Sequence, residues 1–346
     1  STLNGASLYL ENCNVTDASI ALHVTGNLTV HNSILTSVEV TGTEATLINI
    51  FNSQIVHSKG VNSVAFNIVE VNVNIKDSTL DQPLYLVHSS GSISLQDNLF
   101  KHAVTINAKD FNDHTYRIEG NSFIGDASLR MQCRNSGTFI RNNFFETTSI
   151  SPVDLYAQDA GQVYFQHNTF RNCERSSALL KIYGSCTAKI IVSNNTAEDI
   201  STGQFLSVGS SIGEDCESKE FSFNILTNYT GRSVIYIQPY SGQFEISRNI
   251  FTDVQVEVAL VENMSKSNFS LPYNYWGTAD FEAIREKVRD ISKSPTFGYV
   301  DVSPYLTEPE FDSGSSSGTP SDIIIIDSTT TWNNYKSVPS NVWVQK

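Results

Sequence analysis

The chain has 346 residues, with 36 acidic and 22 basic side chains and a formal net charge of −14 at pH 7. This charge argues against nucleic acid as a partner and against a basic patch that binds anionic membrane. No apolar run approaches the ~18 residues of a membrane-spanning helix, so we expect no membrane insertion. The sequence begins without Met or a signal-peptide pattern, and we interpret it as a mature chain or a fragment.

One phrase recurs twelve times between about Leu8 and Trp276: apolar, any, apolar, any, any, Asn, any, apolar. Two of its clearest copies are Ile93–Phe100 and Phe244–Phe251. The residue three before the Asn position and the residue two after it are apolar in all twelve copies. The Asn position forms what we call the register column: Cys13, Ser33, Ser53, Ser78, Asn98, Asn121, Asn143, Asn168, Asn195, Asn224, Asn249 and Asn274.

Successive register residues are 20 to 29 positions apart, a repeat that predicts a solenoid. Apolar residues alternate at period two, which indicates strands, and a second strand such as Val104–Ile106 follows in most units. Strands that run in one direction and stack at ~4.8 Å per coil build an all-β, right-handed parallel β-helix of about twelve coils. Inward Asn side chains should then hydrogen-bond from coil to coil. A β-sandwich or barrel gives no reason for this column.

The five cysteines are only partly accounted for. Cys13 occupies the inward column and is expected to be a small buried residue. Cys186 lies nine residues before Asn195 and Cys216 lies eight before Asn224, so the two are nearly in phase on adjacent coils and a disulfide is predicted. Cys133 and Cys173 are out of phase, and no pairing is assigned to them.

Six Asn-X-Ser/Thr sequons occur, as many as a chain this rich in Asn, Ser and Thr would contain by chance. Two of them stand beside register residues, where the side chain should face solvent, and a third falls in a turn. Glycosylation of an exposed extracellular surface is therefore the expectation. The candidate sites are Asn14, Asn27, Asn194, Asn228, Asn263 and Asn268.

A helix is predicted at about residues 279–291, with Thr278 as its N-cap, and it should cover the last coil of a β-helix domain that spans residues 1–306. Residues 307–322 are predicted to be a Ser/Gly linker. The apolar side chains of the helix fall on one face: Phe281, Ile284, Val288 and Ile291.

Residues 323–346 are expected to form a β-strand tail. The first coil has no capping helix before it, and an open coil invites strand addition. Two hypotheses follow: the tail adds to the first coil of the next molecule in a head-to-tail fibre, or both ends are junctions with further modules of a longer protein. The residues that would carry the assembly are Ile323, Ile324, Ile325, Ile326 and Trp332.

The segment Asn274-Tyr-Trp-Gly277, the helix after it and Gly298–Leu306 resemble the closing segment of extracellular β-helix modules from cell-surface and adhesion proteins. Over residues 6 to 306 the chain looks like the secreted, pectate-lyase-like group of right-handed parallel β-helix proteins. This resemblance implies an extracellular location and a structural or adhesive role.

Many β-helix proteins of that group are polysaccharide lyases or hydrolases, but their motifs (Asn-Thr-Asp, Asp-Asp, Gly-His-Gly, Arg-Ile-Lys) do not occur here. Asp77 and Asp97 are the only acids adjacent in the position before the register residue, and with Asn52 they form a candidate Ca²⁺ site. Two neighbouring carboxylates are more typical of a solvated face than of catalysis. We therefore expect no enzyme activity, no metal and no cofactor.

An outward surface on three successive coils is the best candidate for a ligand site, because exposed aromatic rings beside Arg suit a sugar ring or a protein partner. The alternative is that Phe139 and Tyr164 only cover a loop. The sequence favours an extracellular structural or adhesive protein, with a carbohydrate-active enzyme or its inactive glycan-binding relative as the alternative. The candidate surface is Arg117, Glu119, Phe139, Arg141, Tyr164 and His167.

Overall fold

A computed structural model gives the structure of the chain. The predicted disulfide between Cys186 and Cys216 lies outside the described residues, as do Ile323 and Trp332 of the predicted assembly tail. The structure describes residues 2–4, 7–16, 19–23, 26–43, 46–56, 66–69, 71–88, 91–108, 115–134, 137–148, 151–159, 161–174, 177–185, 187–210, 219–239, 244–309, 324–326 and 342–344.

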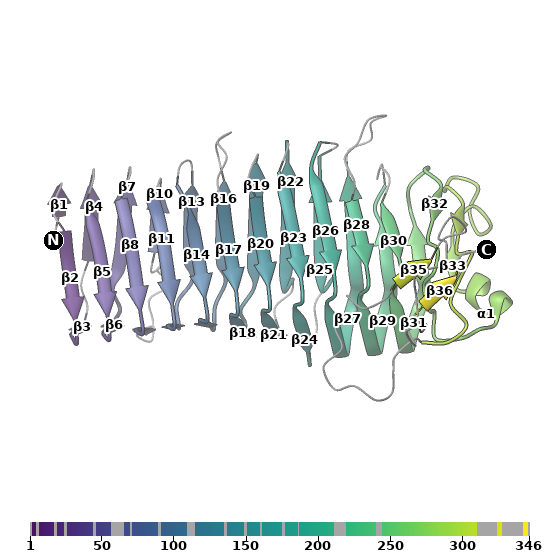
Figure 1. Cartoon of the computed structure of the whole chain (residues 1–346), viewed down its shortest axis with the longest axis horizontal. Coiled ribbons are helices and arrows are strands. Elements are labelled where there is room, and N and C mark those ends of the chain that lie inside the picture. Colours follow the sequence, from purple (N-terminus) through teal and green to yellow (C-terminus); the bar gives the residue numbers. More distant parts are fainter. Residues whose placement is uncertain are drawn as a thin grey trace, which may run out of the picture.

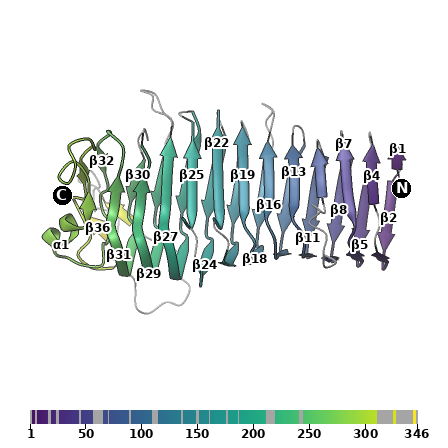
Figure 2. The same ribbon diagram turned by 180° about the vertical axis from the view of Figure 1, so that it is seen from behind.

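The strands that carry the repeated phrase stack in an eleven-stranded sheet, sheet B, in which every strand pair is parallel. Figures 1 and 2 show the coils following one another along a single axis. Sheet B consists of β2 (Ser7–Glu11), β5 (Asn27–His31), β8 (Thr46–Phe51), β11 (Val71–Lys76), β14 (Ile93–Gln96), β17 (Thr115–Glu119), β20 (Gly137–Arg141), β23 (Gln162–Gln166), β26 (Lys189–Ser193), β28 (Lys219–Ser222) and β30 (Glu245–Ser247).

A 21-stranded sheet, sheet A, contains the remaining strands of the coils. A short strand follows the register residue and a second strand follows the next corner; in the last coils the two merge into one long strand. The short strands are β3 (Asn14–Thr16), β6 (Ile34–Thr36), β9 (Gln54–Val56), β12 (Thr79–Leu80), β15 (Leu99–Phe100), β18 (Ser122–Gly125), β21 (Phe144–Thr147) and β24 (Thr169–Arg171). The second strands are β1 (Thr2–Asn4), β4 (Ser19–His23), β7 (Glu39–Thr43), β10 (Phe66–Val69), β13 (Leu84–His88), β16 (Val104–Ala108), β19 (Leu129–Arg134), β22 (Val153–Gln158) and β25 (Leu180–Gly184). The merged strands are β27 (Thr196–Ser210), β29 (Ile225–Ile237) and β31 (Ile250–Asn263), and β33 (Val288–Arg289) ends the sheet.

The parallel β-helix and its register are thus confirmed, and the number of coils is slightly lower than the twelve that the sequence predicts. The twelfth copy of the phrase lies in β32 (Phe269–Ser270), which pairs with β34 (Val300–Asp301) and not with sheet B. The closing segment of the chain therefore takes the place of a further coil.

Hydrogen bonds between register residues join the coils. Each Asn from Asn98 to Asn249 donates from Nδ2 to Oδ1 of the next Asn at 2.8–3.0 Å. The same Oδ1 accepts the backbone N–H of the preceding register residue, at 2.8–3.1 Å. A second Nδ2 hydrogen bond satisfies a strand carbonyl of the previous coil, as from Asn168 to Ile140 at 3.0 Å. The predicted Asn ladder is confirmed.

Serine replaces Asn in the early coils and makes only some of these hydrogen bonds. The backbone N–H of Ser33 donates to Oγ of Ser53 at 3.1 Å, and Ser53 donates to Ser78 in the same way. The hydroxyls donate within their own coil, as from Ser53 to the carbonyl of Phe51 at 2.7 Å. A serine therefore satisfies the buried N–H of the neighbouring coil, and Ser33 also donates to the carbonyl of Leu10 in the previous coil at 3.4 Å, but a serine makes no bond like that between successive Asn side chains.

The residue before each register residue has a left-handed backbone, with φ between 47° and 69°. Asn, Asp and Gly adopt this conformation most readily, which explains their frequency in this column. At Gly120 a Cβ would lie 2.3 Å from Oδ1 of Asp97, so another residue there would require the Asp97 carboxylate to move. His167, Phe223, Arg248 and Tyr273 hold the same conformation against their local preference, since the ladder on one side and the next strand on the other fix the turn.

The apolar residues beside the ladder fill the interior. Phe100, Phe123, Phe145 and Phe170 lie two positions after their register residues and are buried. Their rings stack in sequence, with centroids 5.1, 4.7 and 4.8 Å apart. Offset stacking of this kind adds to the stabilisation from burial alone. The core thus continues from coil to coil without a break.

The terminal helix is shorter than predicted. α1 spans Phe281–Glu286, and its N-cap is Asp280, whose carboxylate accepts from two backbone N–H groups; Thr278 instead accepts from the N–H of Asp280. Only Ile284 of its residues is buried, while Phe281 is half-exposed. Val288 belongs to β33, and Ile291 is 48% exposed. The predicted four-residue apolar face is wrong because the chain returns to sheet A after six helical residues.

No helix in the described part of the chain is long and apolar enough to cross a membrane. α1 lies at the C-terminal end of the stack, as expected (Figure 1). Of the tail, Ile324–Ile326 (β35) pairs in parallel with Val342–Val344 (β36).

Asp290 connects several segments at the end of the coil stack through hydrogen bonds. It is fully buried, and its two oxygens accept from Arg285, Ser292 and the backbone N–H of Val300. Burial by itself would raise the pKa of this carboxyl, but the hydrogen bonds from Ser292 and Val300 and the charge of Arg285 outweigh it, and the net pKa is lowered.

We predict that Asn168→Ala lowers the stability of the coil stack by at least ~3 kcal/mol, because the N–H and amide of Asn143 and the carbonyl of Ile140 each lose their partner. Asn168→Ser should be intermediate, since a hydroxyl oxygen can still accept the N–H of Asn143. Urea unfolding measures both. The control is Asn74→Ala on the partly exposed face of β11, expected to change stability by less than ~0.5 kcal/mol. Equal effects of Asn74→Ala and Asn168→Ala would contradict the role of the ladder.

We also predict that Asp290→Asn makes local opening of the C-terminal segment around Val300 more frequent at neutral pH. A lowered folded pKa stabilises the fold above the unfolded pKa of about 3.9, and this stabilisation is lost as the pH falls through the folded value. Hydrogen exchange at Val300 should therefore be faster in the variant at pH 7, and the difference should shrink below pH ~4. A difference that is constant with pH would show that ionisation of Asp290 is not what holds the segment.

Candidate functional site

The predicted ligand surface lies on the outward face of sheet B. Arg117 of β17, Phe139 of β20 and Tyr164 of β23 are direct register partners on three successive strands. Glu119 and Arg141 form a second row beside them, and both are partly exposed. The structure therefore brings five of the six predicted residues together. The side chains stand on strands and not over a loop.

The aromatic rings are stacked and flanked by cations. Phe139 and Tyr164 have ring centroids 5.2 Å apart and planes 8° from parallel. The guanidinium carbon of Arg141 lies 4.8 Å from the Phe139 centroid, and that of Arg117 lies 5.9 Å from it. Lys189 lies 5.9 Å over the Tyr164 ring. At these distances the ring quadrupole attracts the cations and restricts where they sit.

The cations of this surface have no carboxylate partner. Among the described residues, no ion pair joins Arg117, Arg141 or Lys189 to an acid, although Glu119 is the register neighbour of Arg141. Arg141 donates from Nη2 to Oε1 of Gln166 at 3.1 Å, while its Nε is buried and finds no acceptor among the residues that the structure describes. We call Arg117, Phe139, Arg141, Tyr164 and Lys189 the Arg141 patch.

His167 belongs to a different feature. It occupies the left-handed turn before Asn168, with φ 57°, and its side chain is exposed. No contact joins it to the rings in the described structure. Lys189 is the member that sequence reasoning missed. It opens β26 opposite Gln162, in the column two residues before the one that holds Phe139 and Tyr164, and the next residue in the Tyr164 column is Ile191.

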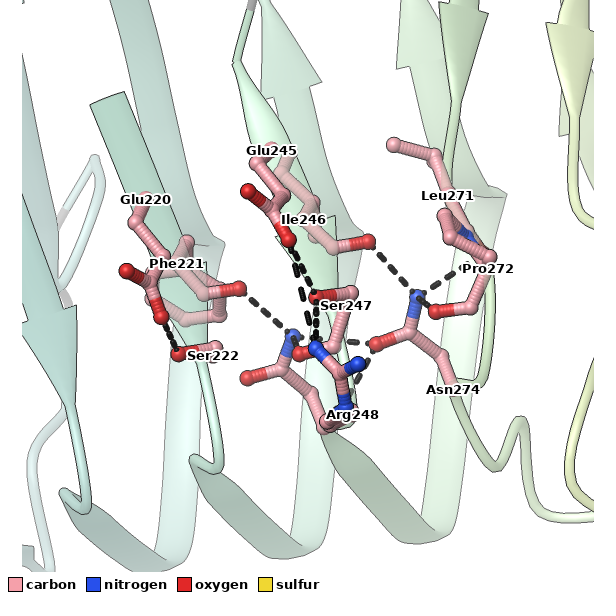
Figure 3. A network of polar contacts seen from close by, with 11 residues as sticks. Glu220, Phe221, Ser222, Glu245, Ile246, Ser247, Arg248, Leu271, Pro272 and Asn274 are labelled. Atoms are coloured by element: carbon pink, nitrogen blue, oxygen red, sulfur yellow. Dashed lines mark hydrogen bonds and ion pairs between the residues drawn. The ribbon is translucent and has the colours of Figure 1, made fainter. Parts of the chain in front are cut away.

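A second aromatic and cationic cluster lies near the C-terminal end of sheet B. The guanidinium of Arg248 lies 5.7 Å from the Phe223 centroid and 5.6 Å from that of Tyr273. Unlike Arg141, it is 4.0 Å from a carboxylate, Glu245. Ser247 donates to Glu245 and accepts from Arg248, so the charge of Arg248 is already balanced (Figure 3).

A third cluster, absent from the sequence analysis, lies on sheet A. Asp154 of β22 is 7% exposed, and its Oδ1 accepts no hydrogen bond from the described residues. Its Oδ2 is 3.7 Å from Nε of Arg130, and Lys181 is its register partner on β25. Burial raises the pKa of Asp154 by more than Lys181 and Arg130 lower it.

Two tyrosines stand in the next column. The rings of Tyr156 and Tyr183 stack with centroids 4.6 Å apart, and Gln238 donates to the Tyr183 hydroxyl at 2.9 Å. A sequence signal for this cluster exists. The second strands align as Leu-Arg-Met-Gln from 129, Val-Asp-Leu-Tyr from 153 and Leu-Lys-Ile-Tyr from 180, which places the charged and aromatic residues in outward columns.

Burial separates the candidate glycosylation sites. Asn14, Asn228 and Asn268 are exposed, while Asn27 and Asn194 are partly exposed. Asn263 is fully buried, and its amide donates to the carbonyls of Ser267 and Gly298 at 3.0 Å each. This contradicts its prediction as a glycosylation site, since a buried amide engaged in two hydrogen bonds leaves no room for a glycan.

Three cysteines are described, and all are free thiols. Burial raises the pKa of Cys173 to about 11 and that of Cys133 to about 12. Thr138 also donates to the Cys133 sulfur at 3.3 Å. Both are therefore unreactive core residues at neutral pH. Cys13 is half-buried in the register column, less enclosed than expected.

The candidate Ca²⁺ residues Asn52, Asp77 and Asp97 all lie in the left-handed turn column. Lys76 is 3.9 Å from the carboxylate of Asp77. No group of three or more His, Cys, Asp or Glu side chains suited to a metal ion occurs within the described ranges. The turn geometry accounts for these residues.

No family model, no curated protein and no solved structure matches this chain.

We predict that Asp154→Asn becomes more stable relative to the unchanged chain as the pH rises from 3.5 to 7. Because the folded pKa of Asp154 is raised, the cost of the buried charge is absent below the unfolded value of about 3.9 and complete above the folded value. The stability of the unchanged chain should thus fall with pH in that window, relative to the variant. Denaturation midpoints measured across this range test it, and parallel curves for the two proteins would contradict it.

Proposed function

We propose that this chain is an extracellular structural and adhesive rod, either a unit of a head-to-tail fibre or one module of a longer surface protein. The observation that carries the proposal is the unbroken ladder of register residues, in which the backbone N–H of every register residue from Cys13 to Asn249 is bound to the next coil.

Such a stack suits a spacer. Eleven parallel strands at ~4.8 Å give sheet B a length of about 48 Å along the axis. Since each coil is joined to its neighbours by sheet hydrogen bonds and by the ladder, bending would break many contacts together. Because the rod is stiff, an adhesive surface on its outer face stays at a fixed distance from both ends.

The first coil supports association along the axis. Among the described strands, β2 pairs only with β5, so its other edge offers backbone donors and acceptors. Tyr9 on β2 is 59% exposed, and Leu8 and Leu10 are only partly buried. Another strand or coil placed there would continue sheet B.

The extracellular location rests on the sequence resemblance and on the exposed sequons at Asn14 and Asn228. It is compatible with free thiols at Cys133 and Cys173, because both are buried.

A carbohydrate-active protein, or its inactive glycan-binding relative, is the second candidate function. Asp154 favours it, because a buried carboxyl with a raised pKa between two cations is typical of a functional site. Depolymerisation of a polysaccharide that is lost in Asp154→Asn would establish this candidate in place of the first.

The head-to-tail form predicts reversible association that strand addition controls. Tyr9→Pro removes an N–H that, by strand alternation, points away from β5, and it should weaken association about tenfold or more. Tyr9→Ala keeps the N–H and is the matched control. Sedimentation over a concentration series measures both. A chain that stays monomeric throughout would leave only the module form, and equal losses in the two variants would replace strand pairing by a side-chain contact.

A further inference from the structure

The Arg141 patch has the opposite charge to the rest of the molecule. The chain has a formal net charge of −14, whereas the patch holds three cations, Arg117, Arg141 and Lys189, with Glu119 as the acid beside them. Three positive charges and one negative charge give a local charge of +2. A soluble anion is repelled by the chain as a whole and attracted here, which is the electrostatic condition for selective binding at this face.

The cations are held in position before any ligand arrives. Arg141 lies over one ring and is tied to Gln166, which in turn donates to Ser193 at 3.0 Å. Its Nε is buried and has no acceptor among the described residues, so a ligand on the outer surface contacts Arg141 through the exposed atoms of the guanidinium. A hydrogen bond between a guanidinium and an anionic oxygen is among the strong ones. Arg248 makes similar ring contacts but has Glu245 at 4.0 Å, whereas no ion pair in the described part of the chain joins Arg141 to an acid.

The direction of the patch limits the shape of the ligand. Arg117, Phe139 and Tyr164 follow one another along the rod axis, one per coil, at a spacing of ~4.8 Å. A sugar ring in a linear polysaccharide has a length close to one coil step. An extended peptide advances ~3.3 Å per residue and falls out of phase with the coils. A linear polysaccharide therefore matches the rows better than an acidic peptide does.

The cations also surround the rings from different sides. Arg117 is level with Phe139 in the preceding coil, Arg141 is two residues further along β20, and Lys189 opens β26 in the coil after Tyr164, two residues before Ile191, the register partner of Tyr164. A tetrahedral anion with three free oxygens can be contacted from several directions, whereas a planar carboxylate is best contacted in its plane. This arrangement favours a sulfate ester.

We infer that the Arg141 patch binds a linear sulfated polysaccharide laid along the rod axis, with a sulfate group at the guanidinium of Arg141. This rests on the proposed adhesive role and names its partner. The Phe139 and Tyr164 rings hold the cations and contact the sugar with their exposed edges. No bond is made or broken in this binding.

The test uses the full chain and dextran sulfate in calorimetry, with unmodified dextran, polygalacturonate and poly-glutamate of similar length as comparisons. We expect dextran sulfate to bind, to weaken as salt rises, and to exceed all three comparisons. Arg141→Gln should weaken binding about tenfold. Phe139→Leu should weaken it by a smaller factor, because Arg141 loses its ring contact.

The matched control is Arg171→Gln. It makes the same change in net charge at an exposed Arg that is paired with Glu198 outside the patch, and it should leave binding unchanged within about twofold. Equal losses of binding in Arg141→Gln and Arg171→Gln would overturn the site and would show that binding depends only on the overall charge of the chain. Equal binding of polygalacturonate would overturn the sulfate assignment, and equal binding of poly-glutamate would overturn the polysaccharide. If the unchanged chain did not bind dextran sulfate but still associated in sedimentation, only this inference would be refuted, because sedimentation tests the rod independently.

Discussion

A single hydrogen-bonding arrangement governs this structure: an inward side-chain oxygen at each register position accepts the backbone N–H of the preceding coil. The turn after each sheet B strand is buried, and its N–H would otherwise have no partner. Asn satisfies it and also bonds to the next Asn, as between Asn143 and Asn168. Ser satisfies the N–H, but its hydroxyl donates to a backbone carbonyl and not to the next register side chain. The fold therefore depends on a polar column inside an apolar core.

The same arrangement determines what the outer surface can present. The ladder forces a left-handed turn just before each register residue, and it locks the strands in register, so outward side chains from successive coils lie directly beside each other. Stacks such as Phe139 on Tyr164 and Tyr156 on Tyr183 follow from this geometry. A surface made of rows along one axis suits extended partners better than compact ones, which connects the rod to its proposed role in adhesion.

The sequence located the Arg141 patch because its outward residues could be counted from the register column. Lys189 was missed because it belongs to the column of Gln162, two residues before the Tyr164 column, and only its side chain reaches the Tyr164 ring. Asp154 was missed because it lies on sheet A, where loops of variable length separate the strand from the register residue. The sequence did not show which charged side chains form ion pairs. Glu245 stands three residues before Arg248 in the sequence, but only the side-chain positions show that the two pair and that no ion pair in the described part of the chain joins Arg141 to an acid.

The sequence by itself determined the fold class, the parallel stacking and the identity of the ladder, because a period-two pattern repeated in phase has one compact solution. The tertiary structure alone decided the closing segment: the helix ends at Glu286, the twelfth phrase leaves sheet B, and Asn263 is buried against Gly298. The physical reason is that a repeat specifies contacts between like coils. At the end of the stack no further coil exists, and the contacts there depend on residues far apart in the chain that no period relates.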